Sequence, residues 1–396
     1  MPRGAREEIR VVLCLFFILF LGVADNQIVS PLLPAIRAQF GKSSKEAGYL
    51  FTAYSFAAGI SVLVWGPLSD IFGRKRGLLT GLAVFAAGSC AVYVSKAYGL
   101  LLTGRVITGM GASMLSLNTI SYAADYFPYA RRGWAMGSIF SSYFAALILG
   151  VPLGSLLGAV LGWNAVFGVS AAAAFLLLAS TAVFLPQAST LSRPSIPGRF
   201  LSYHARTYLL FLRSRGTLGA LLSSFLASAG TMGFLAFVGV WLHDDFGVSG
   251  GRAGLVFLAA GAAALLASPF AGALSDRIGK RLQFVLSNLA LAALLLVLPR
   301  LRWGIQLFLV FGGVSLASAF RQGPMEALIT EVVLASQRGS FVAFKNSFSQ
   351  LGIGLAALAS GMLFEGNGYA AVCRLCAILT LFSALSMLFL VRQKHL

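Results

Sequence analysis

The chain has 396 residues, of which 58% are hydrophobic and 11% are charged, and its mean hydropathy is +0.85. So apolar a composition excludes a water-soluble globular fold. The formal net charge of +18 could suggest a nucleic-acid partner, but no nucleic-acid-binding module accompanies it. Basic residues beside apolar spans are instead typical of membrane topology and lipid headgroups. We therefore expect an integral membrane protein surrounded by membrane lipids, with no nucleic-acid partner.

Apolar stretches long enough to cross a bilayer recur along the whole chain. A hydrocarbon core about 30 Å thick requires roughly 20 apolar residues in a helix. The sequence predicts an all-α membrane protein with twelve transmembrane helices, at residues 11–36, 46–69, 77–95, 98–123, 134–161, 163–186, 217–242, 252–275, 282–299, 303–330, 340–364 and 370–391. The first span could alternatively be a secretory signal, because three arginines precede it and Gly22-Val23-Ala24 resembles a cleavage site. Its helix-like pattern beyond residue 24 favours a transmembrane helix.

Basic residues are unevenly distributed over the connections between spans. With both termini in the cytoplasm, the cytoplasmic connections hold 19 of the 30 Lys and Arg residues, the opposite connections hold 8, and 3 lie within spans. Cytoplasmic connections normally carry this excess. We therefore expect both termini on the cytoplasmic side.

The sequence repeats itself at a constant offset of 206 residues. Residues 40–51 match 246–257, residues 66–75 match 272–281, and Arg132-Gly133 returns as Arg338-Gly339. Because one repeat contains six spans, an even number, the two halves have the same topology and are related by an axis along the membrane normal.

The repeat defines the expected domains. Residues 1–190 form the first six-helix half and residues 216–396 the second. Residues 191–215 are a basic cytoplasmic linker, in which 200–212 combine apolar and basic residues suited to a helix on the headgroup surface.

Four motifs resemble those of one family, the major facilitator superfamily. Residues 66–76, Gly-Pro-Leu-Ser-Asp-Ile-Phe-Gly-Arg-Lys-Arg, are similar to its signature loop between helices 2 and 3, and 272–281 are the degenerate copy. Residues 105–112 resemble its helix 4 motif, and 150–154 resemble the helix 5 motif of its exporters. Residues 25–34 are similar to helix 1 of bacterial drug and sugar-efflux members.

The resemblance implies a proton-coupled exporter of amphipathic or hydrophobic small molecules, working by alternating access as a monomer in the bacterial inner membrane. The helix 5 motif departs from the usual form, because Val151 separates Gly150 from Pro152 and Ser155 replaces a glycine. Two alternatives stay open: a carrier of a specific polar metabolite such as a sugar, nucleoside or amino acid, and a sensor or lipid-handling protein without turnover. The sequence has no phosphate loop and no catalytic constellation. We expect no enzyme and no cofactor, with the proton gradient as the energy source.

Two further motif roles follow from the resemblance and from glycine chemistry. Gly66 and Gly73 permit a tight turn, and the resemblance implies that Asp70 and Arg74 form a charge network with Asp125 that latches the outward-facing state. The alternative is a loop that only sets topology.

Small residues recur in the fifth span. Gly150, Pro152, Gly154 and Gly158 would let this helix approach a neighbour closely. A role in gating and ordinary close packing are equally good interpretations.

Charged residues inside spans break the repeat, since each has an uncharged counterpart 206 residues away. Such asymmetry suits a substrate or proton site better than a shared scaffold. The alternative for three of them is that they reach the inner membrane surface. We also predict a helix break at Gly323-Pro324. Asn118, Asn288, Asn346 and Gln350 either line a cavity or bond between helices. The predicted cavity residues are Asn26, Asn118, Arg321, Glu326, Lys345, Asn346 and Gln350.

Asp25 and Arg105 are the predicted proton-coupling residues. Asp25 lies about 21 Å above the inner end of the first span and Arg105 about 10 Å below the outer end of the fourth, so both are roughly 10 Å deep. Burial favours the neutral acid and a nearby guanidinium favours the carboxylate. A change in their separation would therefore load or release a proton. The alternative is a static ion pair.

Overall fold

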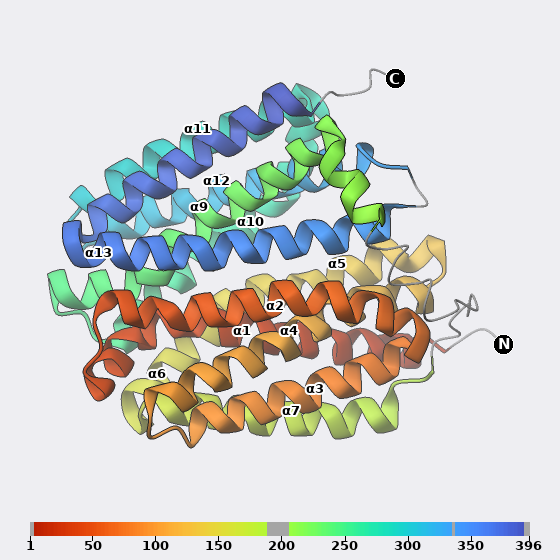
Figure 1. Cartoon of the computed structure of the whole chain (residues 1–396), viewed down its shortest axis with the longest axis horizontal. Coiled ribbons are helices and arrows are strands. Elements are labelled where there is room, and N and C mark those ends of the chain that lie inside the picture. Colours follow the sequence, from red (N-terminus) through yellow and green to blue (C-terminus); the bar gives the residue numbers. More distant parts are fainter. Residues whose placement is uncertain (1–3, 188–205, 335–336, 392–396) are drawn as a thin grey trace.

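The computed structural model describes residues 4–187, 206–334 and 337–391, and within them the chain is a bundle of long helices (Figure 1). The first half consists of α1 (Ala5–Phe40), α2 (Ser44–Phe72), α3 (Arg74–Tyr93), α4 (Tyr98–Tyr126), α5 (Tyr129–Ala145), the π-helix η1 (Ala146–Gly150), α6 (Val151–Leu161) and α7 (Trp163–Phe184). The second half consists of α9 (Arg215–Phe246), α10 (Gly250–Ile278), α11 (Lys280–Val297), the short 3₁₀ helix η2 (Leu298–Arg300), α12 (Ile305–Glu331) and α13 (Arg338–Leu390).

The twelve predicted spans are confirmed. Among the described residues, 11 helices are long and apolar enough to cross a membrane, with α5, η1 and α6 forming one span. The 53-residue α13 is two helices, because Gly368 has the non-helical angles φ 71° and ψ −177°. Figure 1 shows the chain reversing within α13 and returning antiparallel to itself.

The backbone geometry repeats as the sequence does. Three pairs of glycines separated by 206 residues have positive φ, a region that costs glycine little. They are Gly41 and Gly247 at 60° and 63°, Gly73 and Gly279 at 92° and 90°, and Gly162 and Gly368 at 91° and 71°. Each ends one helix and begins the next turn, so the two halves change direction at equivalent positions.

The two halves meet along helices from both sides. In Figure 1, α1 begins and α13 ends at the same end of the bundle, which we call the proximal end; the opposite end is the distal end. α1 and α2 pack against α9 and α13, while η1 and α6 pack against α10. The outer faces expose apolar side chains such as Val160, Leu176 and Leu266, each more than 70% accessible. Such exposure is appropriate to a surface in contact with lipid.

The predicted helix break at Gly323-Pro324 is wrong. α12 continues through Pro324 to Glu331. A proline cannot donate to the carbonyl four residues earlier, which here is that of Phe320. The buried Gln283 of α11 supplies the missing donor: its Nε2 lies 2.9 Å from the Phe320 carbonyl and 2.9 Å from the Ala271 carbonyl of α10. A neighbouring helix thus replaces the lost bond.

The linker is only partly described. Residues 188–205 lie outside the described residues, and 206–213 are helical. Tyr208 stacks on Phe344 of α13 with 4.6 Å between ring centroids, and Phe211 is buried against Phe341. Leu209 and Leu210 are more than half exposed on the other side. The described part of the predicted headgroup helix therefore packs one face on the second half.

Candidate functional site

The centre of the first half contains a buried ion pair between the two predicted proton-coupling residues. Nη1 of Arg105 donates to Oδ2 of Asp25 at 2.6 Å, and each side chain is at most 1% exposed. The pair joins α1 to α4. The two charges that depth along the helices placed at the same level are therefore in direct contact.

Aromatic rings surround the guanidinium. The ring centre of Tyr54 on α2 lies 4.5 Å from Cζ of Arg105, and that of Phe167 on α7 lies 5.8 Å away. Gly109, one turn along α4, allows this arrangement, because a Cβ there would overlap the backbone of Tyr54. Rings stabilise a cation over their faces by about 0.5–2 kcal/mol. Tyr54 was not predicted, because its role depends on helix contacts.

Hydrogen bonding around the pair is incomplete. Oδ1 of Asp25 and both Nε and Nη2 of Arg105 are buried without a partner in the part of the chain that the structure describes. A buried charged group with unused bonding capacity is costly. The pair therefore has the capacity to accept further partners.

A second buried cation lies in the other half. Nη2 of Arg321 on α12 donates to Oγ1 of Thr231 at 2.7 Å and to the Ala227 carbonyl at 3.3 Å, both on α9. Thr231 is the repeat counterpart of Asp25. α1 and α9 also touch at this level, since Gln27 bonds Met232 and Ser30 bonds Leu235.

A third polar group joins two helices of the second half. Nζ of Lys345 on α13 is 2.6 Å from Oε1 of Glu326 on α12, and Gln322 donates to the same oxygen at 3.3 Å. The Glu326 side chain is 38% exposed, whereas that of Lys345 is 7% exposed. The more exposed member of this pair is therefore the carboxylate.

Two of the polar amides considered for the cavity are instead buried inside the helix packing. Asn118 is fully buried against Gly77 of α3, and its amide donates to the Met114 carbonyl of its own helix at 2.8 Å. Asn288 bonds within α11 in the same way. The hydrogen bonds of these two amides to described residues are therefore intrahelical, whereas we predicted that the amides either line a cavity or bond between helices.

The other three amides are partly buried. Asn26 is beside Asp25 on α1, and Asn346 is beside Lys345 on α13. Gln350 approaches Gly59 of α2, so it lies at the interface between the halves, and its buried Oε1 has no partner among the described residues.

The distal end of the interface is closed by polar contacts that the sequence analysis missed. Nη2 of Arg37 on α1 contacts both carboxylate oxygens of Asp244 on α9, at 2.8 and 2.9 Å. The Lys45 amide donates to Glu365 at 3.1 Å, and Thr52 donates to the Gly354 carbonyl at 2.9 Å. We call these contacts, with the packing of Gly239 against Ser30, the distal interface. The sequence did contain a signal for the Arg37–Asp244 ion pair, since these two residues carry opposite charges at almost equivalent positions of the repeat.

The fifth span packs closely on both halves, as its small residues predicted. A Cβ on Gly154 would lie 2.8 Å from Cδ1 of Ile28, and one on Gly150 would lie 2.9 Å from Cβ of Ala24, both on α1. On the other side, Pro152 and Ser155 abut Gly254 of α10. η1 ends just before Pro152, whose missing N–H favours a departure from α-helical bonding.

The signature loop forms part of its predicted network. Nε of Arg74 lies 3.2 Å from Oδ2 of Asp125, and its Nη1 donates to Ser69 at 2.6 Å. Gly73 makes the turn and Gly66 is one turn before Ser69. The side chain of Asp70 lies outside the described part, so its share in the network stays a prediction. The partners named here belong to the first half.

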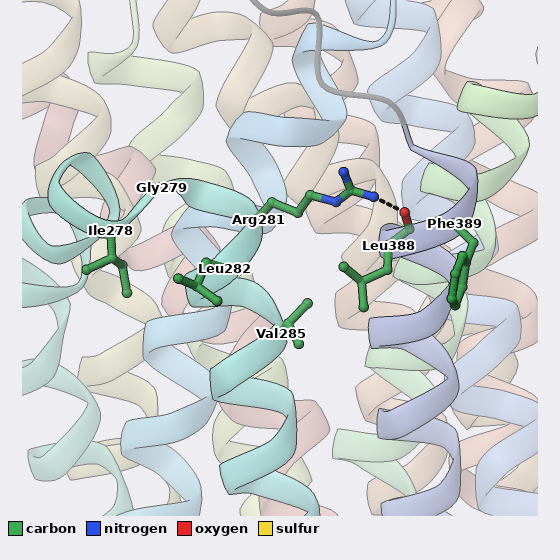
Figure 2. A pocket seen from close by; sticks show the side chains of 7 residues that line it. All are labelled: Ile278, Gly279, Arg281, Leu282, Val285, Leu388 and Phe389. Carbon is green, nitrogen blue, oxygen red and sulfur yellow. Dashed lines mark hydrogen bonds between the residues drawn. The ribbon is translucent and has the colours of Figure 1, made fainter.

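A surface pocket lies away from these groups. A hollow of about 580 Å³ lies between the start of α11 and the end of α13. Figure 2 shows the side chains that line it. Apolar side chains line it, and Arg281 reaches across to donate to the Leu388 carbonyl. That bond satisfies one of the last carbonyls of α13.

Two halves of six spans that turn at equivalent positions, with buried charges inside each half, are the architecture of a membrane transporter. A family model described as Major Facilitator Superfamily matches residues 15–241 and again 220–396. The chain belongs to the major facilitator superfamily, as its motifs predicted.

Relatives span almost the whole chain. Uncharacterised MFS-type transporters YwfA and YceJ of Bacillus subtilis are each 26% identical to it, over 91% and 93% of this chain and 87% and 93% of theirs. Efflux pump dotC of Dothistroma septosporum is 32% identical over 40% of this chain and 27% of its own. A crystal structure of a D-xylose-proton symporter matches with a TM-score of 0.78 at 18% identity, covering 97% and 98% of the two chains. That likeness shows the fold.

Proposed function

We propose that this protein is a proton-driven exporter of amphipathic or hydrophobic small molecules that works by alternating access. The observation that carries the proposal is the buried Asp25–Arg105 pair with its unused hydrogen-bonding atoms. A static pair that only neutralised two charges would be best stabilised with every donor and acceptor occupied. Incomplete bonding favours a pair that opens during the cycle.

The chemistry of coupling follows from that opening. While Arg105 is in contact, its positive charge favours the carboxylate form of Asp25. Once the guanidinium moves to another acceptor, the buried carboxylate has lost its compensating charge and takes up a proton. The ring of Tyr54 stabilises the guanidinium in its place over the site.

The distal interface supports the alternating-access part of the proposal. It closes one end of the contact between the halves. Its ion pair of Arg37 and Asp244 is partly exposed to solvent, and such pairs are weak enough to break in each cycle. In a protein with cytoplasmic termini this closure would define an inward-facing state. The signature-loop latch would then form across the halves in the opposite state.

Placement and direction belong to the same proposal. The excess of basic residues in alternate connections supports cytoplasmic termini, and bacterial relatives support the inner membrane. A relative named as an efflux pump supports export. We further propose that the protein works as a monomer in contact with lipid.

The test is Asp25→Asn in proteoliposomes, with a compound chosen by a thermal-shift screen of the purified protein. We expect counterflow of labelled compound to persist and accumulation driven by a pH gradient to be lost. Arg302→Gln, at an exposed distal position, is the control. A mutant that still accumulates the compound with the gradient would eliminate Asp25 as the required carrier, and absence of counterflow in the native protein would favour a sensor.

A further inference from the structure

Arg321 is a buried cation that lacks an anionic partner. Arg321 is only 4% exposed. Its guanidinium donates to a neutral hydroxyl and to a carbonyl oxygen. Nε and Nη1 have no partner in the described part of the chain. Arginine has five donors and stays charged in proteins. An uncompensated charge in such a place costs several kcal/mol.

The acidic residues considered as partners for Arg321 are either paired with another cation or far along the helix. Glu326, five residues along α12, is paired with Lys345 at 2.6 Å. Glu331 is ten residues along the same helix, about 15 Å away along the axis. Asp25 is paired with Arg105. Of the charges within the central spans, three are positive and two are negative, so the centre of the bundle has a surplus positive charge at Arg321.

The neighbourhood of Arg321 is open to a ligand. Gln322 and Gly323 follow it on α12 and are exposed, and a Cβ on Gly323 would meet nothing within 4 Å. Glu326, one turn beyond Gln322, has a side chain that is 38% exposed. This part of α12 therefore has open space beside it that a ligand could occupy.

We propose that the transported amphiphile is an anion, and that Arg321 binds its carboxylate, sulfonate or phosphate group through Nε and Nη1. Nε and Nη1 lie on different edges of the planar guanidinium, so each offers a place for a charge-assisted hydrogen bond to an oxygen of such a group. Thr231 and the Ala227 carbonyl hold Nη2 in position. The inference rests on the proposed transport function and names its substrate class.

The probes are three naphthalene compounds that differ in charge: naphthalene-2-sulfonate, naphthalene-2-sulfonamide and trimethyl-(2-naphthyl)ammonium. The sulfonate is ionised at every pH of interest, so it cannot cross as a neutral acid or carry a proton itself. Equilibrium binding to the purified full chain in detergent needs no turnover. We expect the sulfonate to bind best, and Arg321→Gln to weaken its binding about 10- to 100-fold. Arg321→Lys should recover part of that loss, because it restores the positive charge but not the planar guanidinium with its several donors.

Stability without ligand separates a binding role from a structural one. If Arg321 is an anion-binding residue, it has no anionic partner in the ligand-free protein. Arg321→Gln then removes an uncompensated buried charge, and the ligand-free variant should have an equal or higher melting temperature. If the arginine is a structural tie between α9 and α12, the same change should lower the melting temperature. Arg302→Gln should change neither binding nor stability.

The outcomes keep the two proposals apart. Sulfonate binding that depends on Arg321, without gradient-driven transport of any probe, would sustain the anion site and contradict the exporter. Gradient-driven transport of the neutral or cationic probe with no preference for the sulfonate would sustain the exporter and overturn the anion site. Unchanged sulfonate affinity in Arg321→Gln would also overturn it.

Discussion

Gly239 offers a test of the distal interface. A Cβ at this position would overlap the Ser30 carbonyl oxygen, and would lie 2.6 Å from the Ser30 carbonyl carbon and 2.9 Å from Cα of Pro31. These are backbone atoms of α1, so no side-chain rotation can relieve the overlap. Ordinary carbon contacts begin near 3.5 Å, and Gly239→Ala would therefore need the two helices to separate by several tenths of an ångström or more.

The expected effect is conformational. Overpacking of this kind costs about 1–3 kcal/mol, and the cost applies only while the distal interface is closed. Alanine also stabilises an exposed helix by up to about 1 kcal/mol relative to glycine, whichever way the halves are arranged. Gly239→Ala should therefore shift the population toward a distally open state by about 5- to 150-fold without preventing folding.

The assay is a distance measurement between spin labels at the exposed residues Ala38 and Asp245, in a background without the native cysteines. Gly239→Ala should increase the separation. Gly312→Ala is the matched control, since its Cβ would meet Ala263 at an ordinary 3.7 Å. An unchanged distance distribution in Gly239→Ala, with normal transport, would refute the closed distal interface.

Three other substitutions test separate parts of the structure. Asp70→Asn should insert normally and lose transport, because the latch needs its charge; near-normal flux would contradict the latch. Gly154→Leu should impair folding or transport, since even its Cβ would crowd Ile28, and unchanged flux would remove this contact from the mechanism. Gln283→Leu should lower the melting temperature, because it leaves the buried Phe320 carbonyl without its donor at about 1–3 kcal/mol; an unchanged melting temperature would show that another donor replaces it.

Features that depend on local pattern could be predicted from the sequence. Span length and hydrophobicity specified the twelve helices, and the 206-residue offset specified equivalent turns at Gly73 and Gly279. Depth along a helix is also local, so Asp25 and Arg105 could be placed at one level before any contact was known. The structure shows them in direct contact, and their role in coupling stays a prediction.

Features that depend on a partner from another helix could not be predicted in the same way. The break expected at Pro324 is absent because Gln283 bonds the carbonyl that the proline leaves free. Tyr54 covers Arg105 only because Gly109 brings α2 close to α4. In each case the decisive group is far away in sequence.

The π-helix η1 gives the fifth span a freedom of register. A π-turn holds about one residue more than an α-turn, so it can move along a helix without breaking either end. Each residue that passes through it turns by about 100° and advances by about 1.5 Å. Tyr143 lies three residues before η1, while Gly154 lies four residues after it and is packed on α1. A shift of the π-turn would therefore rotate the segment that carries Tyr143 relative to the segment that carries Gly154.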